Sequence, residues 1–544
     1  MGLRDKRGPI CIMELPRPTS GIKPGAALVQ GTAVEAIATE AAPKAGRREW
    51  IGLAVIAIPC LLYSMDLTVL HLAVPKLSTD LEPTSAQLLW IIDIYGFLVA
   101  GSLITMGTLG DRIGRRRLLL FGAAAFGVAS VLAAFAKTAV MLIASRAVLG
   151  VAGATIAPST LSLIRNMFLD PHQRTVAVSI WATSYSLGGA IGPLIGGALL
   201  QTFWWGSVFL IAVPAMVLLL IVGPRFLPEY RDPSAGRLDL ASAAMSLVAV
   251  LSMIFGLKEI AQDGVSLMSM LSIAAGLVLG IAFARRQLRL DIPLIDLRLF
   301  GQPGFSASLA TYGLTILVMF GGFLFLPQYL QLVLGLSPFA AGVWTLPWAL
   351  AFVVGSLLTP PLVRRINHAY LMAGGLVLSS IGFAMFTTVG RGTSFAWFAT
   401  GTVIFCLGMS PVFTLCTDLI IGTAPPERAG AASALSETSA ELGGALGIAL
   451  FGSIGVAMYR TAMASRIAPS LTGHDAEAAR ATLGGAVAAA GQLPPDQAQL
   501  LIDAGRGAFI TALQVCATIS MAGSLALAVF VAVSLRHVRR AAAA

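Results

Sequence analysis

The 544-residue chain is poor in charged side chains, and this scarcity excludes most classes of water-soluble protein. Lys, Arg, Asp and Glu together make up 11% of the residues, whereas hydrophobic residues make up 57%. Soluble globular domains carry about 25% charged residues, which supply the polar surface they need in water. Together with the mean hydropathy of +0.84, this predicts an all-α polytopic membrane protein.

Cysteine and histidine are also scarce, with five of each in the whole chain. They show no metal-ligand spacing, and no nucleotide-binding loop or nucleophile elbow is visible elsewhere. We therefore expect free thiols, no metal, no cofactor and no enzymatic activity.

The N-terminal segment lacks the features of a signal peptide. Residues 1–49 are rich in Ala, Gly, Pro and Arg and contain no apolar core or small-residue cleavage site. We expect a disordered cytoplasmic tail, in which Met13 is an alternative start. The net charge of +10 does not indicate a nucleic-acid partner, because the basic residues lie in short loops between apolar runs.

Long apolar runs dominate the rest of the chain. Fourteen of them reach the roughly 20 residues that cross about 30 Å of hydrocarbon. They lie near 51–73, 87–109, 118–136, 139–162, 176–199, 206–223, 239–257, 267–284, 305–327, 338–362, 371–389, 395–418, 431–457 and 509–535. The segment 458–508 between the last two is predicted to be a long extracytoplasmic loop, with partial helical structure as one reading.

The distribution of basic residues supports this count. Arg is concentrated in alternate short loops, and the intervening short loops hold only Lys76, Lys137, Lys258 and Arg391. By the positive-inside rule, the Arg-rich loops and both termini are cytoplasmic. We expect a multi-pass protein of the bacterial cytoplasmic membrane.

The span order suggests two related halves. A faint repeat of the loop after the second span follows the tenth span. The sequence predicts an N-terminal six-helix bundle over 50–225, two extra helices over 226–300 and a C-terminal six-helix bundle over 301–544.

A glycine-rich and arginine-rich loop joins the second and third spans. Its sequence is G-T-L-G-D-R-I-G-R-R-R, and its fixed positions are Gly107, Asp111, Arg112, Gly114 and Arg115. Glycine permits a sharp turn and close helix approach, and Asp111 can pair with basic residues or cap a helix. The segment resembles the hallmark loop of the major facilitator superfamily, although a plain positive-inside loop would share its charge.

Two further segments strengthen this resemblance. Arg146 lies inside the fourth span, where an unpaired cation costs several kcal/mol. It resembles an arginine that the family associates with proton coupling. The alternative is a structural role, in which the side chain donates hydrogen bonds to nearby backbone carbonyls. The fifth span contains a small-residue stretch that permits close helix packing and resembles the antiporter motif of the family's exporters. Its key residues are Gly188, Gly192, Pro193, Gly196 and Gly197.

Acidic residues in the first two spans narrow the resemblance. Asp66 and Asp93 both lie in apolar surroundings. Their segments are similar to those of the fourteen-span drug:proton antiporters of the QacA, SmvA and LfrA type, in which matching acids serve proton coupling and transport. Trp90 and Tyr95 share the span of Asp93 and are our candidates for stacking on planar cations, although aromatic residues at this depth commonly belong to the lipid belt.

Glu437 and Glu441 lie four residues apart in the thirteenth span, on one face of the predicted helix. Like charges so placed repel, so in a low-dielectric cavity at least one should hold a proton near neutral pH. The alternative for Glu437 is that it reaches the cytoplasmic interface. Span ten contains no acidic residue, whereas some relatives carry one there, and this absence favours monocationic over dicationic substrates. Asp418, at the cytoplasmic end of span twelve, is expected to face the membrane–water interface.

These features together predict a proton-coupled antiporter that exports lipophilic, mainly monocationic drugs, dyes or quaternary ammonium antiseptics by alternating access. The proton gradient would supply the energy, and we expect a monomer surrounded by membrane lipid. An exporter of a lipid, siderophore or other metabolite has the same fold and remains an alternative. An importer would leave the antiporter-like glycines unexplained, and a sensor would need no intramembrane carboxylates.

Overall fold

The computed structural model describes most of the chain after the N-terminal tail. The described residues are 43–83, 85–231, 239–290, 293–336, 338–390, 392–425, 428–464, 479–480 and 482–536. Most of the predicted tail lies outside these ranges, but its last residues, from Arg47, already belong to the first described helix.

Within the described residues the structure is all-helical, as predicted. The helices before the predicted linker are α2 (Arg47–Leu81), α3 (Ser85–Ile113), α4 (Arg115–Ala134), α5 (Ala139–Gly153), α6 (Ile156–Met167), α7 (Pro171–Thr202), α8 (Ser207–Leu210) and α9 (Ala212–Phe226). The two extra helices are α10 (Leu240–Asp263) and α11 (Leu267–Gln287).

The remaining helices form the C-terminal part. They are α12 (Pro303–Phe323), α13 (Leu326–Gln328), α14 (Pro338–Val343), α15 (Leu346–Val363), α16 (His368–Thr387), α17 (Phe395–Thr423), α18 (Ala429–Ala464), α20 (Leu483–Ala490) and α21 (Pro495–Ser534), with short turns η2 (Leu297–Gly301) and η3 (Tyr329–Val333).

Thirteen helical segments of the described chain are long and apolar enough to cross a membrane. Several are continuous spans built from two helices, such as α5 with α6. The fifth predicted span corresponds to α7, which is 32 residues long but is not among the thirteen. Its serines, threonines and glycines make it less apolar, and its length alone suits a fourteenth span.

Several helices extend beyond the apolar runs that predicted them. Helices α18 and α21 extend beyond their predicted spans, so the connection between them shrinks from 458–508 to 465–494 and includes α20. Lys76 and Lys258, both predicted in loops, lie inside α2 and α10. Hydropathy marks where apolar residues stop, whereas a helix continues as long as its backbone hydrogen bonds do.

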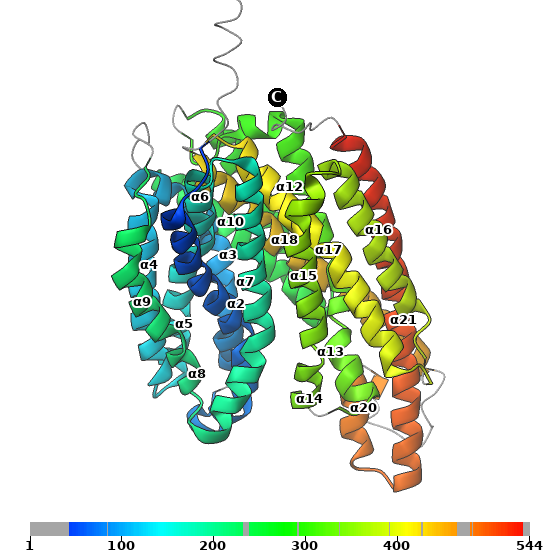
Figure 1. The fold of residues 1–544 in the computed structure, drawn as a ribbon. Helices are drawn as coiled ribbons and strands as arrows, with labels where there is room; N and C mark the ends of the chain where they lie inside the picture. The colour runs from blue at the N-terminus through cyan, green and yellow to red at the C-terminus, as the bar shows by residue number, and fades with distance from the viewer. Residues whose placement is uncertain are drawn as a thin grey trace, which may run out of the picture. The chain divides into compact units, whose positions relative to one another are not determined.

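Two large apolar cores hold the helices together. One is formed almost entirely by buried residues between Leu53 and Leu227, and the other by residues between Leu299 and Leu535. A smaller cluster joins α10 to both α3 and α18. In Figure 1 helices α4, α5, α8 and α9 lie on the left of the view, and α16, α17 and α21 lie on the right. The predicted domain boundaries remain a prediction.

Candidate functional site

A buried ion pair joins α2 to α5. Arg146 Nη1 lies 2.8 Å from Asp66 Oδ2, and the two side chains are only 2% and 8% exposed. Arg146 Nε also donates to the Ile91 carbonyl at 3.1 Å. The arginine therefore pairs with an acid and also braces a neighbouring backbone carbonyl, and its role in proton coupling remains a prediction.

Tyr95 and Phe209 enclose the Arg146 guanidinium. Its carbon lies 4.6 Å from the Tyr95 ring centroid and 5.9 Å from that of Phe209. Tyr95 is completely buried, and its hydroxyl has no hydrogen-bond partner among the described residues. Such a ring stabilises a cation at low dielectric and leaves one polar group free for a ligand or water.

Glu437 and Glu441 form a second acidic centre one turn apart on α18, and both are half-buried. Glu437 Oε1 is buried and lacks a hydrogen-bond partner within the described chain. A role of this carboxylate pair in proton coupling stays a prediction.

Aromatic side chains form a cluster beside the Arg146 centre. Tyr63 lies 6.1 Å from Tyr95 and 5.6 Å from Tyr185 between ring centroids, and Trp181 lies 4.6 Å from Tyr185. Trp181 Nε1 donates to Thr160 Oγ1 at 3.0 Å. The result is a cluster of rings that extends from Arg146 through Tyr95 and Tyr63 to Tyr185 and Trp181, and aromatic faces of this kind suit flat cations. Tyr63 was not predicted, yet its position three residues before Asp66 places both on one face of α2.

Asp93 does not join the Asp66 centre. It forms an ion pair with Lys258 of α10, and the Lys258 ammonium lies 4.7 Å from the Phe97 ring centroid. Trp90 is 45% exposed and contacts Phe97. Trp90, Asp93 and Phe97 therefore share the α10 side of α3, and Tyr95 alone of the predicted aromatic pair reaches Arg146.

The motif between α3 and α4 forms a one-residue turn. Only Gly114 separates the helices, with φ of +112°, which side chains other than glycine rarely adopt. A Cβ there would also collide with Glu229. Glu229 Oε2 lies 3.5 Å from Arg116 Nε and 3.7 Å from Arg117 Nε. A residue outside the motif therefore holds the turn in place.

The same motif reaches α18. Asp111 pairs with Arg115, which is fully buried. At Gly430, near the start of α18, an added Cβ would meet the Arg115 guanidinium. At Gly107 it would lie 2.6 Å from Ala434 Cβ, also on α18. Arg112 occupies the last turn of α3, so the motif ties the two halves together at this end.

The glycine stretch of α7 packs against α2. A Cβ at Gly188 would collide with the Leu61 backbone, and one at Gly196 with Val69. Gly192 is buried, Gly197 has open space beside it, and the Pro193 side chain lies outside the described residues. This geometry explains why α7 needs glycines for close packing against α2. The direction of transport remains a prediction.

Asp418 does not face the membrane–water interface, where it was expected. It is 3% exposed and accepts from Arg174 Nε and Thr175 Oγ1, both at 2.7 Å. Nearby, Ser356 Oγ donates to the Ser179 carbonyl at 3.3 Å. These contacts join α7 to α15 and α17 between the two halves.

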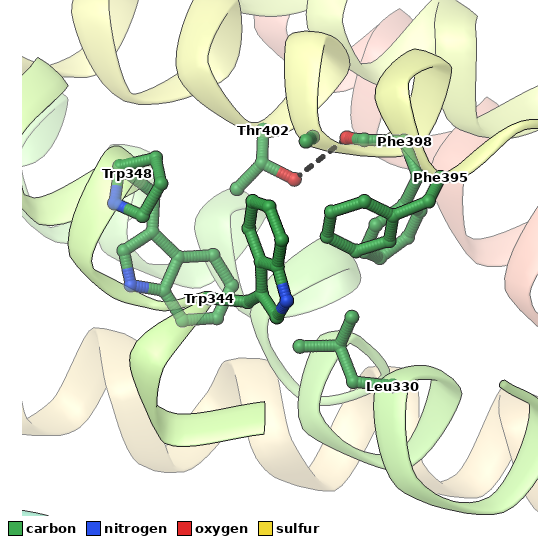
Figure 2. A pocket seen from close by; sticks show the side chains of 8 residues that line it. Leu330, Trp344, Trp348, Phe395, Phe398 and Thr402 are labelled. Carbon is green, nitrogen blue, oxygen red and sulfur yellow. Dashed lines mark hydrogen bonds between the residues drawn. The ribbon is translucent and has the colours of Figure 1, made fainter. Parts of the chain in front are cut away.

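An aromatic pocket lies among α15, α17 and the residues before α15. Figure 2 shows Trp344, Trp348, Phe395 and Phe398 around it, with Thr402 donating to the Phe398 carbonyl. Its volume is about 10 Å³, enough for a water molecule at most. No charged residue lines it, so it does not suit an organic cation in this conformation.

The chain has close relatives among characterised transport proteins. It is 42% identical over 490 residues to the multidrug efflux pump LfrA of Mycolicibacterium smegmatis, covering 90% of this chain and 97% of the relative. It is 38% identical over 485 residues to the methyl viologen resistance protein SmvA of Salmonella typhimurium, covering 88% and 96%.

Solved structures agree on the fold. The human organic anion transporter MFSD10 superposes with a TM-score of 0.60 at 16% identity, covering 89% of this chain and 99% of that one. A bacterial homologue of the lysosomal transporter Spinster gives 0.53 at 18% identity, covering 91% and 99%. Residues 56–448 match the Major Facilitator Superfamily. The chain is therefore a multi-pass membrane transporter that belongs to the major facilitator superfamily.

Proposed function

We propose that the protein is a proton-coupled antiporter that exports lipophilic, mainly monocationic drugs, dyes or antiseptics from the bacterial cytoplasm. The observation that best supports this proposal is the presence of two acidic centres, Asp66 with Arg146 and Glu437 with Glu441, and of a cluster of aromatic rings beside the first of them. The names of the relatives LfrA and SmvA support export of drugs.

The chemistry follows from the charges. Two carboxylates one turn apart at low dielectric do not both ionise, so Glu437 and Glu441 share at least one proton when no cation is bound. A bound lipophilic cation supplies the missing positive charge and displaces that proton. Its aromatic surface would lie against Tyr63, Tyr95 and Tyr185, where face contacts stabilise a desolvated cation.

Arg146 ties proton occupancy to conformation in this proposal. The Asp66 carboxylate is paired with Arg146 in the present state, and protonation of Asp66 would release the guanidinium toward Tyr95 and the α18 carboxylates. The contacts of Asp111, Arg115 and Asp418 steady the state in which the cytoplasmic ends of the halves meet. The halves then alternate by rocking, with both termini inside the cell.

A transport assay tests the proposal. Everted vesicles containing the protein should take up ethidium when a proton gradient, acid inside, is imposed, and an uncoupler should abolish the uptake. Uptake that persists with the uncoupler would remove proton coupling. Absence of uptake for ethidium and tetraphenylphosphonium alike would remove the cation substrate.

One observation favours a second candidate, an exporter of a lipid-like metabolite. A groove of about 340 Å³ between α12 and α18 is lined by Leu309, Leu314, Leu317 and other apolar residues, with Thr438 and Ser439 beside the acidic turn. If neutralising both Glu437 and Glu441 left export intact, this candidate would replace the cation exporter.

A further inference from the structure

Two buried serines of α18 have hydroxyl groups without hydrogen-bond partners beside Glu437. Ser433 and Ser436 are completely buried, and neither Oγ bonds to any group among the described residues. Glu437, the residue after Ser436, has a buried Oε1 that is unpartnered in the same way. A buried polar atom without a partner is costly, and in native structures water commonly satisfies such atoms.

Many buried hydroxyls of this bundle bond within their own helix instead. Ser410 of α17 is as deeply buried as Ser433, and its Oγ donates to the Leu407 carbonyl at 2.9 Å. A serine inside a helix ordinarily finds such a carbonyl three or four residues earlier. Other unpartnered hydroxyls occur, as at Ser520 of α21, but those of Ser433 and Ser436 lie next to an unpartnered carboxylate oxygen.

Gly430, Ser433 and Glu437 share one face of α18. Spacings of three and four residues place them on successive turns, over about 10 Å from the first to the last. Arg115, at the start of α4, lies against the first of them, because a Cβ on Gly430 would collide with its guanidinium. Arg115 is fully buried, and its Nε and Nη1 also lack hydrogen-bond partners within the described chain. These unpartnered polar atoms form a polar column from the turn motif to the acid.

We propose that Ser433 and Ser436 hold water that carries the proton of Glu437 toward the end of the transporter assigned to the cytoplasm. This inference rests on the proposed function. When a cation binds, the O–H bond of protonated Glu437 breaks, the carboxylate stays with the cation, and the proton passes along the polar column to the solution. The serines are positioning residues, because they act through the water that they hold.

Arg115 keeps this path from becoming a leak in the present state. Its guanidinium lies at the Gly430 end of the polar column, where α4 and α18 meet. A fixed positive charge at a constriction opposes the passage of an excess proton. Separation of α4 from α18 at this end removes the charge, so the path opens only when the site itself opens to the cytoplasm.

Proteoliposomes test the role assigned to Arg115. Under an imposed pH gradient without any cation substrate, Arg115→Gln should increase the proton leak several-fold, whereas Arg115→Lys, which retains the charge, should not. A leak that stays at the wild-type value in Arg115→Gln would contradict this role.

Stopped-flow measurement of proton release tests the two serines. Tetraphenylphosphonium is mixed with the purified protein in weakly buffered detergent solution that contains a pH indicator, and its affinity is measured separately at equilibrium. Ser433→Ala and Ser436→Ala should each release the wild-type number of protons at about one tenth of the wild-type rate, because one hydrogen-bonded step is lost. The affinity should not change. Ser410→Ala removes a hydroxyl that bonds within its own helix and, as the matched control, should keep the wild-type rate.

Thermal unfolding gives a second readout that does not depend on transport. Removal of an unpaired hydroxyl from a dry site stabilises a protein, so a higher unfolding temperature in Ser433→Ala than in the wild type would overturn the inference. Wild-type rates of proton release in both serine variants would overturn it as well. If Ser433→Ala is not recovered folded, Ser436→Ala decides. A wild type that binds the cation without releasing protons overturns the proposed function itself, before any variant is compared.

Discussion

At the scale of single residues, the strongest constraint on the protein is the Asp66–Arg146 pair. Both side chains are almost completely buried, and desolvation of two charges is repaid only by good geometry. Removing one partner leaves an uncompensated charge, whereas removing both does not. A comparison of the single and double substitutions therefore distinguishes the contribution of the pair to stability from its contribution to transport.

Asp66→Asn should therefore lower the free energy of unfolding by about 3–5 kcal/mol and abolish gradient-driven transport. The double substitution Asp66→Asn with Arg146→Leu should recover most of the stability without restoring transport. Thermal unfolding of the purified protein and vesicle uptake measure the two effects. Asp80→Asn, at an exposed acid of the same helix, serves as control, and a fully active Asp66→Asn protein would contradict the assignment.

Sequence reasoning located the intramembrane charges but could not pair them all. Asp66, Arg146, Glu437 and Glu441 are conspicuous because each interrupts an apolar run. The partner of Asp93 was missed, because Lys258 follows the apolar run of its span and was read as a loop residue. Trp90 and Tyr95 were chosen because they share a span with Asp93, but a shared span does not fix a shared face. Residues three apart, such as Trp90 and Asp93, lie on one face of a helix, whereas residues five apart, such as Trp90 and Tyr95, do not.

At the scale of elements, the turn between α3 and α4 depends on one backbone conformation. Gly114 has a positive φ, and Glu229 occupies the space where a side chain would begin. The sequence predicts a sharp turn here from its glycines. It could not predict Glu229, which is more than a hundred residues distant in sequence and arrives only when α9 packs against α4.

Gly114→Ala should destabilise the protein by about 1–3 kcal/mol, because a non-glycine residue is strained at this φ and its methyl group displaces Glu229. The drop in thermal unfolding temperature should be absent from Gly127→Ala, since a Cβ at that helical glycine would meet only Met216 Cβ at an ordinary 3.6 Å. Equal stability of both variants would show that the turn tolerates a side chain.

At the scale of the whole molecule, two apolar cores are joined by a small number of polar contacts. Asp418 with Arg174 and Thr175, and Ser356 with Ser179, connect the halves near the ends assigned to the cytoplasm. Such contacts can separate without disturbing either core, as alternating access requires. They hold the present state closed at this side.

Asp418→Asn should weaken this closure by about 1.5 kcal/mol or more, a population shift of roughly tenfold, because a charge-assisted contact is lost. The yield of disulfide cross-linking between Ser179→Cys and Ser356→Cys, in a background without native cysteines, should fall accordingly. Asp239→Asn removes an acid that pairs with Arg286 between the extra helices and should leave the yield unchanged. An equal yield in Asp418→Asn would remove Asp418 from the closing contact.

The overall fold followed from hydropathy and charge, because a bilayer imposes span length and orientation on every segment. The ends of α18 and α21 could not be predicted, since a helix that continues beyond the membrane loses its apolar signal. Contacts between halves, such as that of Asp418, were also invisible, because they join residues more than two hundred positions apart.

The central claim is that the α18 carboxylates exchange protons for an organic cation, and proton release on binding tests it most directly. Tetraphenylphosphonium is added to the purified protein in weakly buffered detergent solution near pH 7, and the released protons and bound cation are counted together. The wild type should release protons as it binds, and Glu437→Gln with Glu441→Gln should release none. Binding of the cation by the wild type without any proton release would contradict the account.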